Sequence, residues 1–283
     1  MLRPVWRYVP RGLLWRVVPA GSGLLLGEVR TEDRKNAWFF CLEERTGHVL
    51  WERLDFGLGW WCGVEAVSGG LAFLHGFASP DLPVHKSVHA VDLRTGRLLW
   101  SAQGLRFVKA GGDTVYAQEE TLAGSILFEL DARTGARHRT GMPEDGAVLP
   151  THRATENTKA EEPTFPVPLP SVGRVDPDVG AILRELSGPE ETGPTAEVLL
   201  VDGLVIACRT TMIERLFRSE LMVIGRNGHR VLYREEIAAA IAPPPPESFF
   251  VRGGMVIYIK DRTMLTGVDL RATGEYRKEG STP

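Results

Sequence analysis

A strand–turn–strand unit recurs along this chain, and a glycine closes its tight turn at five places. The turn glycines are Gly47, Gly96, Gly135, Gly228 and Gly274, and the intervals between them are 49, 39, 93 and 46 residues. Three intervals match one propeller blade and the fourth matches about two. A glycine-containing turn and an apolar run precede each unit, so one repeat holds two hairpins. The repeat therefore predicts an all-β chain of four-stranded blades.

The units also alternate apolar and polar residues, as strands with one buried face do. The segments AWFFCLEERTGHVLW (37–51) and VHAVDLRTGRLLW (88–100) show this alternation on both sides of the turn. A helical rhythm occurs only in short pieces. The pattern thus favours the all-β class over a mixed fold.

In the unit 88–100, each turn residue has a structural role. The carboxylate of Asp92 can accept hydrogen bonds from the turn amides that follow it. Gly96 supplies the positive φ that a short hairpin loop requires. Trp100 returns four residues later, on a face that can pack against the neighbouring blade. These residue types predict a structural device rather than a reactive group.

The motif around this turn resembles the tryptophan-docking motif of the quinoprotein dehydrogenase-like propellers, the PQQ-like repeat family. The best copy keeps the alanine, the aspartate, the Thr-Gly pair and the tryptophan, and two further copies keep part of the set. The motif residues are Ala90, Asp92, Thr95, Gly96 and Trp100; Thr46, Gly47 and Trp51; and Asp131, Thr134 and Gly135. The resemblance covers residues 18–143 and 198–278. It implies a propeller scaffold, since that family holds both quinone-dependent dehydrogenases and a non-catalytic assembly lipoprotein, and this chain resembles an uncharacterised non-catalytic member.

The blade count follows from the spacing, with one irregular segment. We expect a single domain over residues 1–283 with five to six blades, in which the opening stretch 6–18 completes the C-terminal blade. Residues 144–197 break the repeat and are rich in proline and glutamate, so we expect an insertion there. Within it, residues 176–186 have helical spacing behind an N-capping aspartate and a proline. The helix would offer a candidate partner contact made of Val179, Ile182, Leu183 and Leu186.

Composition excludes several classes of protein. The net charge of −3 and the pI near 6.2 argue against a nucleic-acid binder. Three widely spaced cysteines do not form a disulfide framework and are expected to be small core residues. Arg7, Arg11 and Arg16 interrupt the N-terminal apolar stretch, so neither a signal peptide nor membrane insertion is expected. The expected location is the cytoplasm.

Histidines and tryptophans are the side chains that could form a metal-binding or ligand-stacking site. His75, His85 and His89 cluster in one unit, but residues four apart on a strand lie about 13 Å apart. We therefore expect no metal site there. Trp60 and Trp61 point to opposite faces of a strand, so one packs between blades and the other faces solvent or a channel, where it could stack on a ligand.

Two further stretches have a structural and a functional interpretation. The basic N-terminal stretch holds Arg3, Arg7, Arg11 and Arg16 among aromatic residues and could touch an acidic partner, although a solvated strand face accounts for it. The proline run 243–246 follows an expected helical turn at 235–242, and a rigid connector between blades is favoured over a polyproline ligand.

No nucleophile elbow, phosphate-binding loop or cofactor-ligand set occurs in the sequence. We therefore expect a non-enzymatic binding or scaffold propeller that needs no cofactor and holds a protein or small-ligand partner. The alternative is a quinoprotein-like or hydrolase-type enzyme that uses the central funnel. A third hypothesis is a degenerate propeller that stabilises a complex and binds nothing small.

Overall fold

The computed structural model describes residues 1–33, 35–79, 82–139, 162–168, 195–213, 216–226, 230–241 and 248–276. These residues form two compact units. The middle unit comprises Arg11–Glu44 and His48–Ala160, and the terminal unit comprises Met1–Pro10, Arg45–Gly47 and Glu161–Pro283. That residues 1–283 are one domain stays a prediction.

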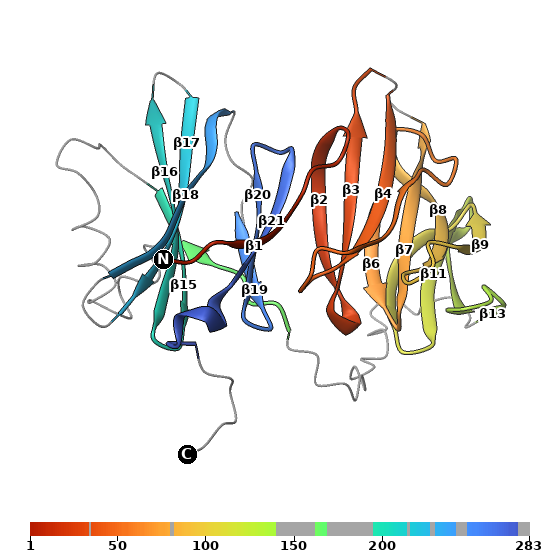
Figure 1. The fold of residues 1–283 in the computed structure, drawn as a ribbon. Helices are drawn as coiled ribbons and strands as arrows, with labels where there is room; N and C mark the ends of the chain where they lie inside the picture. Colours follow the sequence, from red (N-terminus) through yellow and green to blue (C-terminus); the bar gives the residue numbers. More distant parts are fainter. Residues whose placement is uncertain are drawn as a thin grey trace, which may run out of the picture. The chain divides into compact units, whose positions relative to one another are not determined.

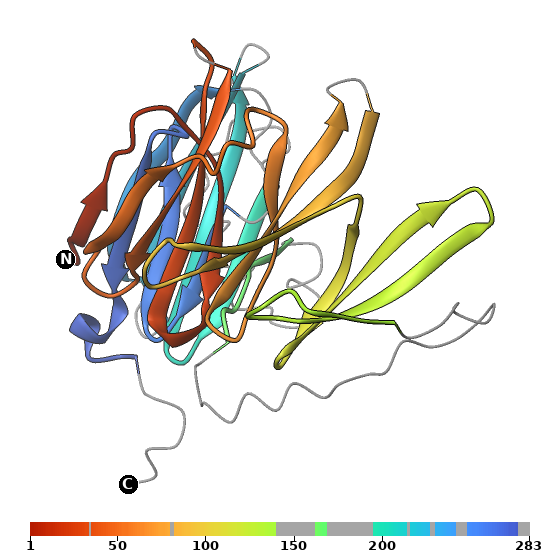
Figure 2. The ribbon, with the colours of Figure 1, turned by 90° about the vertical axis from the view of Figure 1, so that its right-hand side faces the viewer.

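The middle unit holds three four-stranded antiparallel sheets, each with its strands in chain order. Figure 1 shows β2, β3 and β4 as adjacent strands, and Figure 2 shows β11 and β12 as a long two-stranded arm. The strands are β2 (Leu13–Ala20), β3 (Leu24–Thr31), β4 (Asn36–Glu43) and β5 (Val49–Leu54); β6 (Cys62–Ser68), β7 (Leu71–Ser79), β8 (Leu82–Asp92) and β9 (Leu98–Gln103); and β10 (Arg106–Gly111), β11 (Thr114–Thr121), β12 (Gly124–Asp131) and β13 (Arg137–Arg139).

The terminal unit holds the two remaining sheets. One has the order β1-β21-β20-β19, so β1 lies beside β21, the last strand of the described residues, and the other has the order β14-β15-β16-β17-β18. The strands are β1 (Pro4–Tyr8), β14 (Val167–Pro168), β15 (Thr195–Val201), β16 (Leu204–Ile213), β17 (Leu216–Gly225), β18 (Arg230–Ile241), β19 (Phe249–Arg252), β20 (Met255–Lys260) and β21 (Met264–Asp269).

The described residues contain five antiparallel sheets, four with four strands and one with the short edge strand β14 as a fifth, which confirms the all-β propeller class built from four-stranded blades. The opening stretch is divided: Pro4–Tyr8 joins the last strand, whereas Leu13–Ala20 begins the next sheet. Among the described residues no helix is long and apolar enough to cross a membrane.

The core forms where neighbouring sheets of a unit face each other. In the middle unit, Leu26 and Phe39 pack with Val64 and Leu74 of the following sheet, and all four are buried. Burying such side chains stabilises each sheet pair by about 2 kcal/mol per residue. Strand β3 is buried along nearly its whole length, as expected of a strand enclosed on both faces.

The expected helix-containing insertion receives no support. Residues 176–186 lie outside the described residues. The described parts of the insertion, 162–168 and 195–197, hold the isolated bridge of Thr164 with Val251, the two-residue edge strand β14 and the start of β15. The helical turn expected at 235–242 is wrong, because β18 continues through Ile241 as a strand. Its alanines favour a helix by local propensity, but pairing with β17 and the burial of Ile237 outweigh that preference.

Candidate functional site

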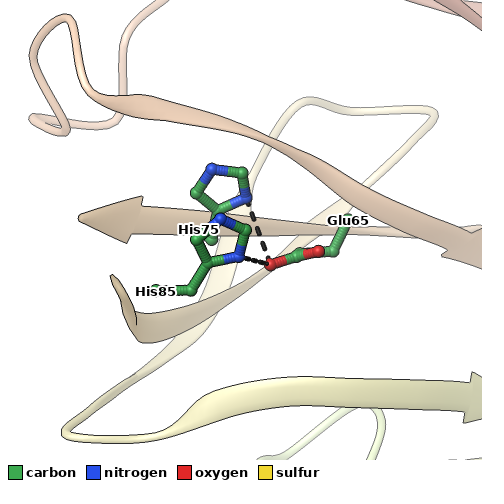
Figure 3. Close-up of side chains that lie close together, drawn as sticks. All are labelled: Glu65, His75 and His85. Carbon is green, nitrogen blue, oxygen red and sulfur yellow. Dashed lines mark hydrogen bonds and ion pairs between the residues drawn. The ribbon is translucent and has the colours of Figure 1, made fainter. Parts of the chain in front are cut away.

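Three polar side chains of the middle unit converge from three neighbouring strands. Glu65 lies on β6, His75 on β7 and His85 on β8. His75 and Phe77 are two residues apart, so they point to the same face of the sheet, and His85 lies opposite Phe77 on that face. Figure 3 shows both imidazole rings directed at the Glu65 carboxylate.

Two β-bulges help to bring these side chains together. The register of β6 against β7 shifts between Val64 and Ala66, which makes Glu65 the extra residue. A second shift, between Gly76 and Phe77, lies beside His85 on the β7–β8 pair. Bulges redirect single side chains and are common next to functional sites. The convergence therefore depends on pairing irregularities that alternation alone does not predict.

The two rings and the carboxylate are in direct contact. Nδ1 of His75 lies 3.2 Å from Oε1 of Glu65, and Nδ1 of His85 contacts the same oxygen. The rings are stacked with their centroids 3.7 Å apart and their planes at 9°. One ligand atom from each of the three residues lies within 4.8 Å of the other two. His75 is buried, whereas the His85 side chain keeps 30% of its surface exposed.

The electrostatic environment favours an ionised carboxylate at this place. Burial acts to raise the pKa of Glu65, but the two imidazoles beside it outweigh burial and hold that pKa below its usual range. His75 Nδ1 approaches Glu65 Oε1 to 3.2 Å as an ion-pair contact, although its alignment does not meet hydrogen-bond geometry.

A glycine makes room for the buried ring. A Cβ atom on Gly63 would lie 3.0 Å from Cε1 of His75, and 3.4 Å from both His75 Nε2 and Glu28 Oε2. The buried Glu28 carboxylate and the His75 ring therefore border the same space above Gly63. Burial raises the pKa of Glu28, with the adjacent guanidinium of Arg30 opposing that rise.

The expectation that these histidines are too far apart for one ion is wrong for His75 and His85. It rests on a separation along one strand, whereas these two side chains face each other across the β7–β8 hairpin. It holds for His89, which hydrogen-bonds Ser101 Oγ and Ser87 Oγ, each at 2.8 Å. Sequence alternation did not identify Glu65 at all, since no motif marks it.

A second group on the middle unit is an aromatic patch made of Trp15, Trp60 and Trp61. The guanidinium of Arg30 lies 5.6 Å from the Trp15 ring centroid and 5.4 Å from that of Trp60. Arg30 also hydrogen-bonds the carbonyl oxygens of Trp60 and Cys62 and the Glu28 carboxylate, so it is fixed in place. Trp61 packs edge-on against Phe77 at 6.2 Å. Trp15 and Trp61 remain 54% and 45% exposed.

The residues of the docking motif fasten neighbouring sheets in the middle unit. Oδ1 of Asp92 accepts hydrogen bonds from the amides of Arg94 and Thr95 and from the Thr95 hydroxyl. Asp131 makes the equivalent bonds, with Thr134 in the place of Thr95. Trp51 donates from Nε1 to the carbonyl oxygen of Leu93 at 2.8 Å.

Each motif tryptophan covers the turn glycine of the following sheet. Trp51 lies against Gly96 and Trp100 against Gly135, both within contact distance of a Cβ that glycine lacks. Within the terminal unit, Trp6 covers Gly47 in the same way. Ala90 is fully buried opposite Trp100, and Thr46 lies in the turn that Gly47 closes.

Two arginines of the basic N-terminal stretch contact other residues of their own unit. Arg7 lies 3.3 Å from Glu235 in the terminal unit, and Arg16 donates to the carbonyl oxygen of Val64 at 2.7 Å in the middle unit. These contacts match the interpretation as a strand face. Glu235 also accepts hydrogen bonds from Lys260 Nζ at 2.8 Å and from the Tyr233 and Tyr258 hydroxyls. Burial acts to raise the pKa of its carboxyl, but these hydrogen bonds and the Lys260 charge hold that pKa at about 2.

The predicted partner-contact residues Val179, Ile182, Leu183 and Leu186 lie outside the described residues, and their role stays a prediction. The three cysteines are buried and unpaired. Burial raises the pKa of Cys41 and Cys62 to about 12 and that of Cys208 to about 11, which makes the thiols poor nucleophiles.

One family model matches part of this chain, and the role of that family is unknown. A family model described as a domain of unknown function (DUF4905) matches residues 18–100. No curated protein matches the sequence.

Among solved structures, the chain is similar to a europium-containing methanol dehydrogenase, with a TM-score of 0.30 and 11% identity over 93% of this chain and 52% of that one. It is also similar to TolB from Acinetobacter baumannii (TM-score 0.28, 9% identity, 90% and 67% covered). The uncharacterized protein lmo1340 from Listeria monocytogenes EGD-e gives a TM-score of 0.33 at 9% identity, with 91% and 96% covered. The chain thus spans about half of the methanol dehydrogenase, and similarities at this level carry no argument about activity.

Proposed function

We propose that this chain is a non-enzymatic binding propeller that docks a protein partner through the aromatic patch of its middle unit. The carrying observation is that two tryptophans, Trp15 and Trp61, stay about half exposed beside a buried and fully engaged Arg30. Tryptophan contributes a large apolar contact area at a low entropic cost, which is why it dominates the energetic centres of protein interfaces.

The local structure supports a preformed surface rather than an accidental exposure. Trp15 is the extra residue at a register shift between Leu14 and Arg16 on β2, and a bulge of this kind redirects a side chain. The carbonyl oxygens of Trp60 and Cys62 are tied to Arg30, which holds the backbone on both sides of Trp61. A rigid aromatic surface loses little freedom when it binds.

The test is capture of partners from the native lysate with the full-length chain as bait. The Trp61→Ala variant should lose the proteins that the unaltered chain retains, because half of the indole surface is available for contact. Leu122→Ala is the matched control, since Leu122 is a fully exposed apolar residue of the same unit. It should retain the same proteins as the unaltered chain.

Two outcomes would contradict the proposal. One is an identical set of captured proteins for the unaltered chain and Trp61→Ala, and the other is no specific capture by the unaltered chain. Leu183→Asp provides a separate arm for the predicted contact within residues 144–197. If that variant alone loses the captured proteins, the docking surface lies in the insertion and not in the patch.

A further inference from the structure

We propose that Glu65, His75 and His85 bind a divalent transition-metal ion of the zinc class. The inference goes beyond the docking function and uses different side chains. Its basis is one carboxylate and two imidazoles whose ligand atoms lie within 4.8 Å of one another on three paired strands. Two histidines and one carboxylate are a ligand set that zinc uses, with further positions left for water or another ligand.

The distance between the ligand atoms is close to that of a zinc site. Zinc lies about 2.0–2.2 Å from nitrogen and carboxylate ligands in a tetrahedral site, which places the ligand atoms roughly 3.4 Å apart. The observed 3.2 Å between His75 Nδ1 and Glu65 Oε1 is close to that value. The His85 side chain keeps 30% of its surface exposed, so an ion can reach the cluster from solvent at this residue.

The arrangement of the two rings sets what metal binding requires. They are stacked with their centroids 3.7 Å apart and their planes at 9°, whereas an imidazole nitrogen binds a metal ion in the plane of its own ring. Both rings would therefore turn out of the stack so that each Nδ1 faces an ion beside Glu65 Oε1, the oxygen that both nitrogens already contact.

The surroundings resemble the outer environment of a metal site. Metal-binding histidines commonly have a carboxylate near the ring nitrogen that does not bind the metal. A Cβ on Gly63 would lie 3.4 Å from both His75 Nε2 and Glu28 Oε2, so the two side chains border the same space. Phe77 packs edge-on against both imidazoles, with centroid distances of 5.1 Å to His75 and 4.9 Å to His85. Both proposed ligand rings are therefore packed against Phe77.

The experiment titrates the full-length chain, stripped of metal by a chelator and dialysed, with Zn²⁺ alone and with Co²⁺ alone. The unaltered chain should bind one zinc ion per chain, and cobalt should give the intense visible absorption of a low-coordinate site. His85→Ala and Glu65→Gln should each weaken binding by at least about 10-fold, because loss of a direct ligand costs no less than loss of an outer contact. Both residues are partly exposed, so these variants should keep the far-UV spectrum of a folded β-protein.

The matched control is His138→Ala, which removes an exposed histidine of the same unit. It should bind zinc as the unaltered chain does, and zinc should raise the Tm of both but not that of His85→Ala. The proposal is overturned if the unaltered chain binds zinc no more tightly than His85→Ala. It is also overturned if His138→Ala weakens binding equally, since the uptake is then adventitious. Neither outcome depends on whether a protein partner docks on the aromatic patch.

Discussion

The indole N–H of Trp100 donates a 2.8 Å hydrogen bond to the carbonyl oxygen of Ala132, the residue that follows Asp131 in the turn of the next sheet. The same indole lies over Gly135, where a Cβ would approach Cδ2 of Trp100 to 2.8 Å. One side chain therefore connects two sheets by a hydrogen bond and by van der Waals contact with the Gly135 backbone. Trp51 repeats this relationship with Leu93 and Gly96.

We expect Trp100→Ala to lower the free energy of unfolding by about 2–4 kcal/mol, below the range for a fully buried tryptophan because Trp100 is half-buried. Trp100→Phe keeps a ring over Gly135 but loses the donor, so its cost should be about 1 kcal/mol. Urea denaturation followed by circular dichroism measures both. Equal costs for the two variants would contradict the role of the ring contact.

Gly135→Ala should destabilise the chain by more than Gly104→Ala. Both glycines have a positive φ, 71° and 78°, so alanine is strained at both positions by roughly 1 kcal/mol. Only at Gly135 does the added methyl meet a tryptophan, since nothing lies within 4 Å of a Cβ on Gly104. The difference between the two urea midpoints isolates the Trp100 contact, and identical midpoints would argue against it.

Acid should weaken the Asp92 turn. Burial acts to raise the pKa of Asp92, but hydrogen bonds from Thr95 and from the Arg94 amide outweigh it and hold that pKa below 3.8. A depressed pKa contributes stability above the unfolded value of 3.8, and this contribution is lost as the pH falls through the lower folded value. Asp92→Asn should therefore be less stable than the unaltered chain at neutral pH, with a smaller difference in acid. Urea midpoints across pH test this, and a constant difference would count against it.

The native chain should react slowly with a bulky thiol reagent. Cys41, Cys62 and Cys208 are buried and unpaired, and burial raises the pKa of each thiol, so little thiolate is present near neutral pH. Denaturant should expose all three, and the absorbance of the released chromophore measures the rate in each state. Rapid labelling of the native chain would show that the strands open more readily than their packing implies.

The sequence by itself determines the repeated blade and its turn. Asp92, Thr95 and Gly96 act on one another within a few residues, and the distance along the chain to Trp100 is set by the hairpin, so local chemistry specifies this element. The five turn glycines therefore predict the strand class and the approximate number of sheets. Local propensity fails at 235–242, where pairing with β17 outweighs the helical preference of alanine.

Only the tertiary structure decides which polar side chains meet. His75 and His85 meet because the pairing of β7 with β8 shifts its register between Gly76 and Phe77, which places His85 opposite Phe77. Glu65 joins them at an irregularity of the β6–β7 pair that no local pattern marks. Register and bulges are set by the packing of whole strands against their neighbours. No short stretch of the chain determines them, because the free energy of that packing comes from residues far apart in the sequence.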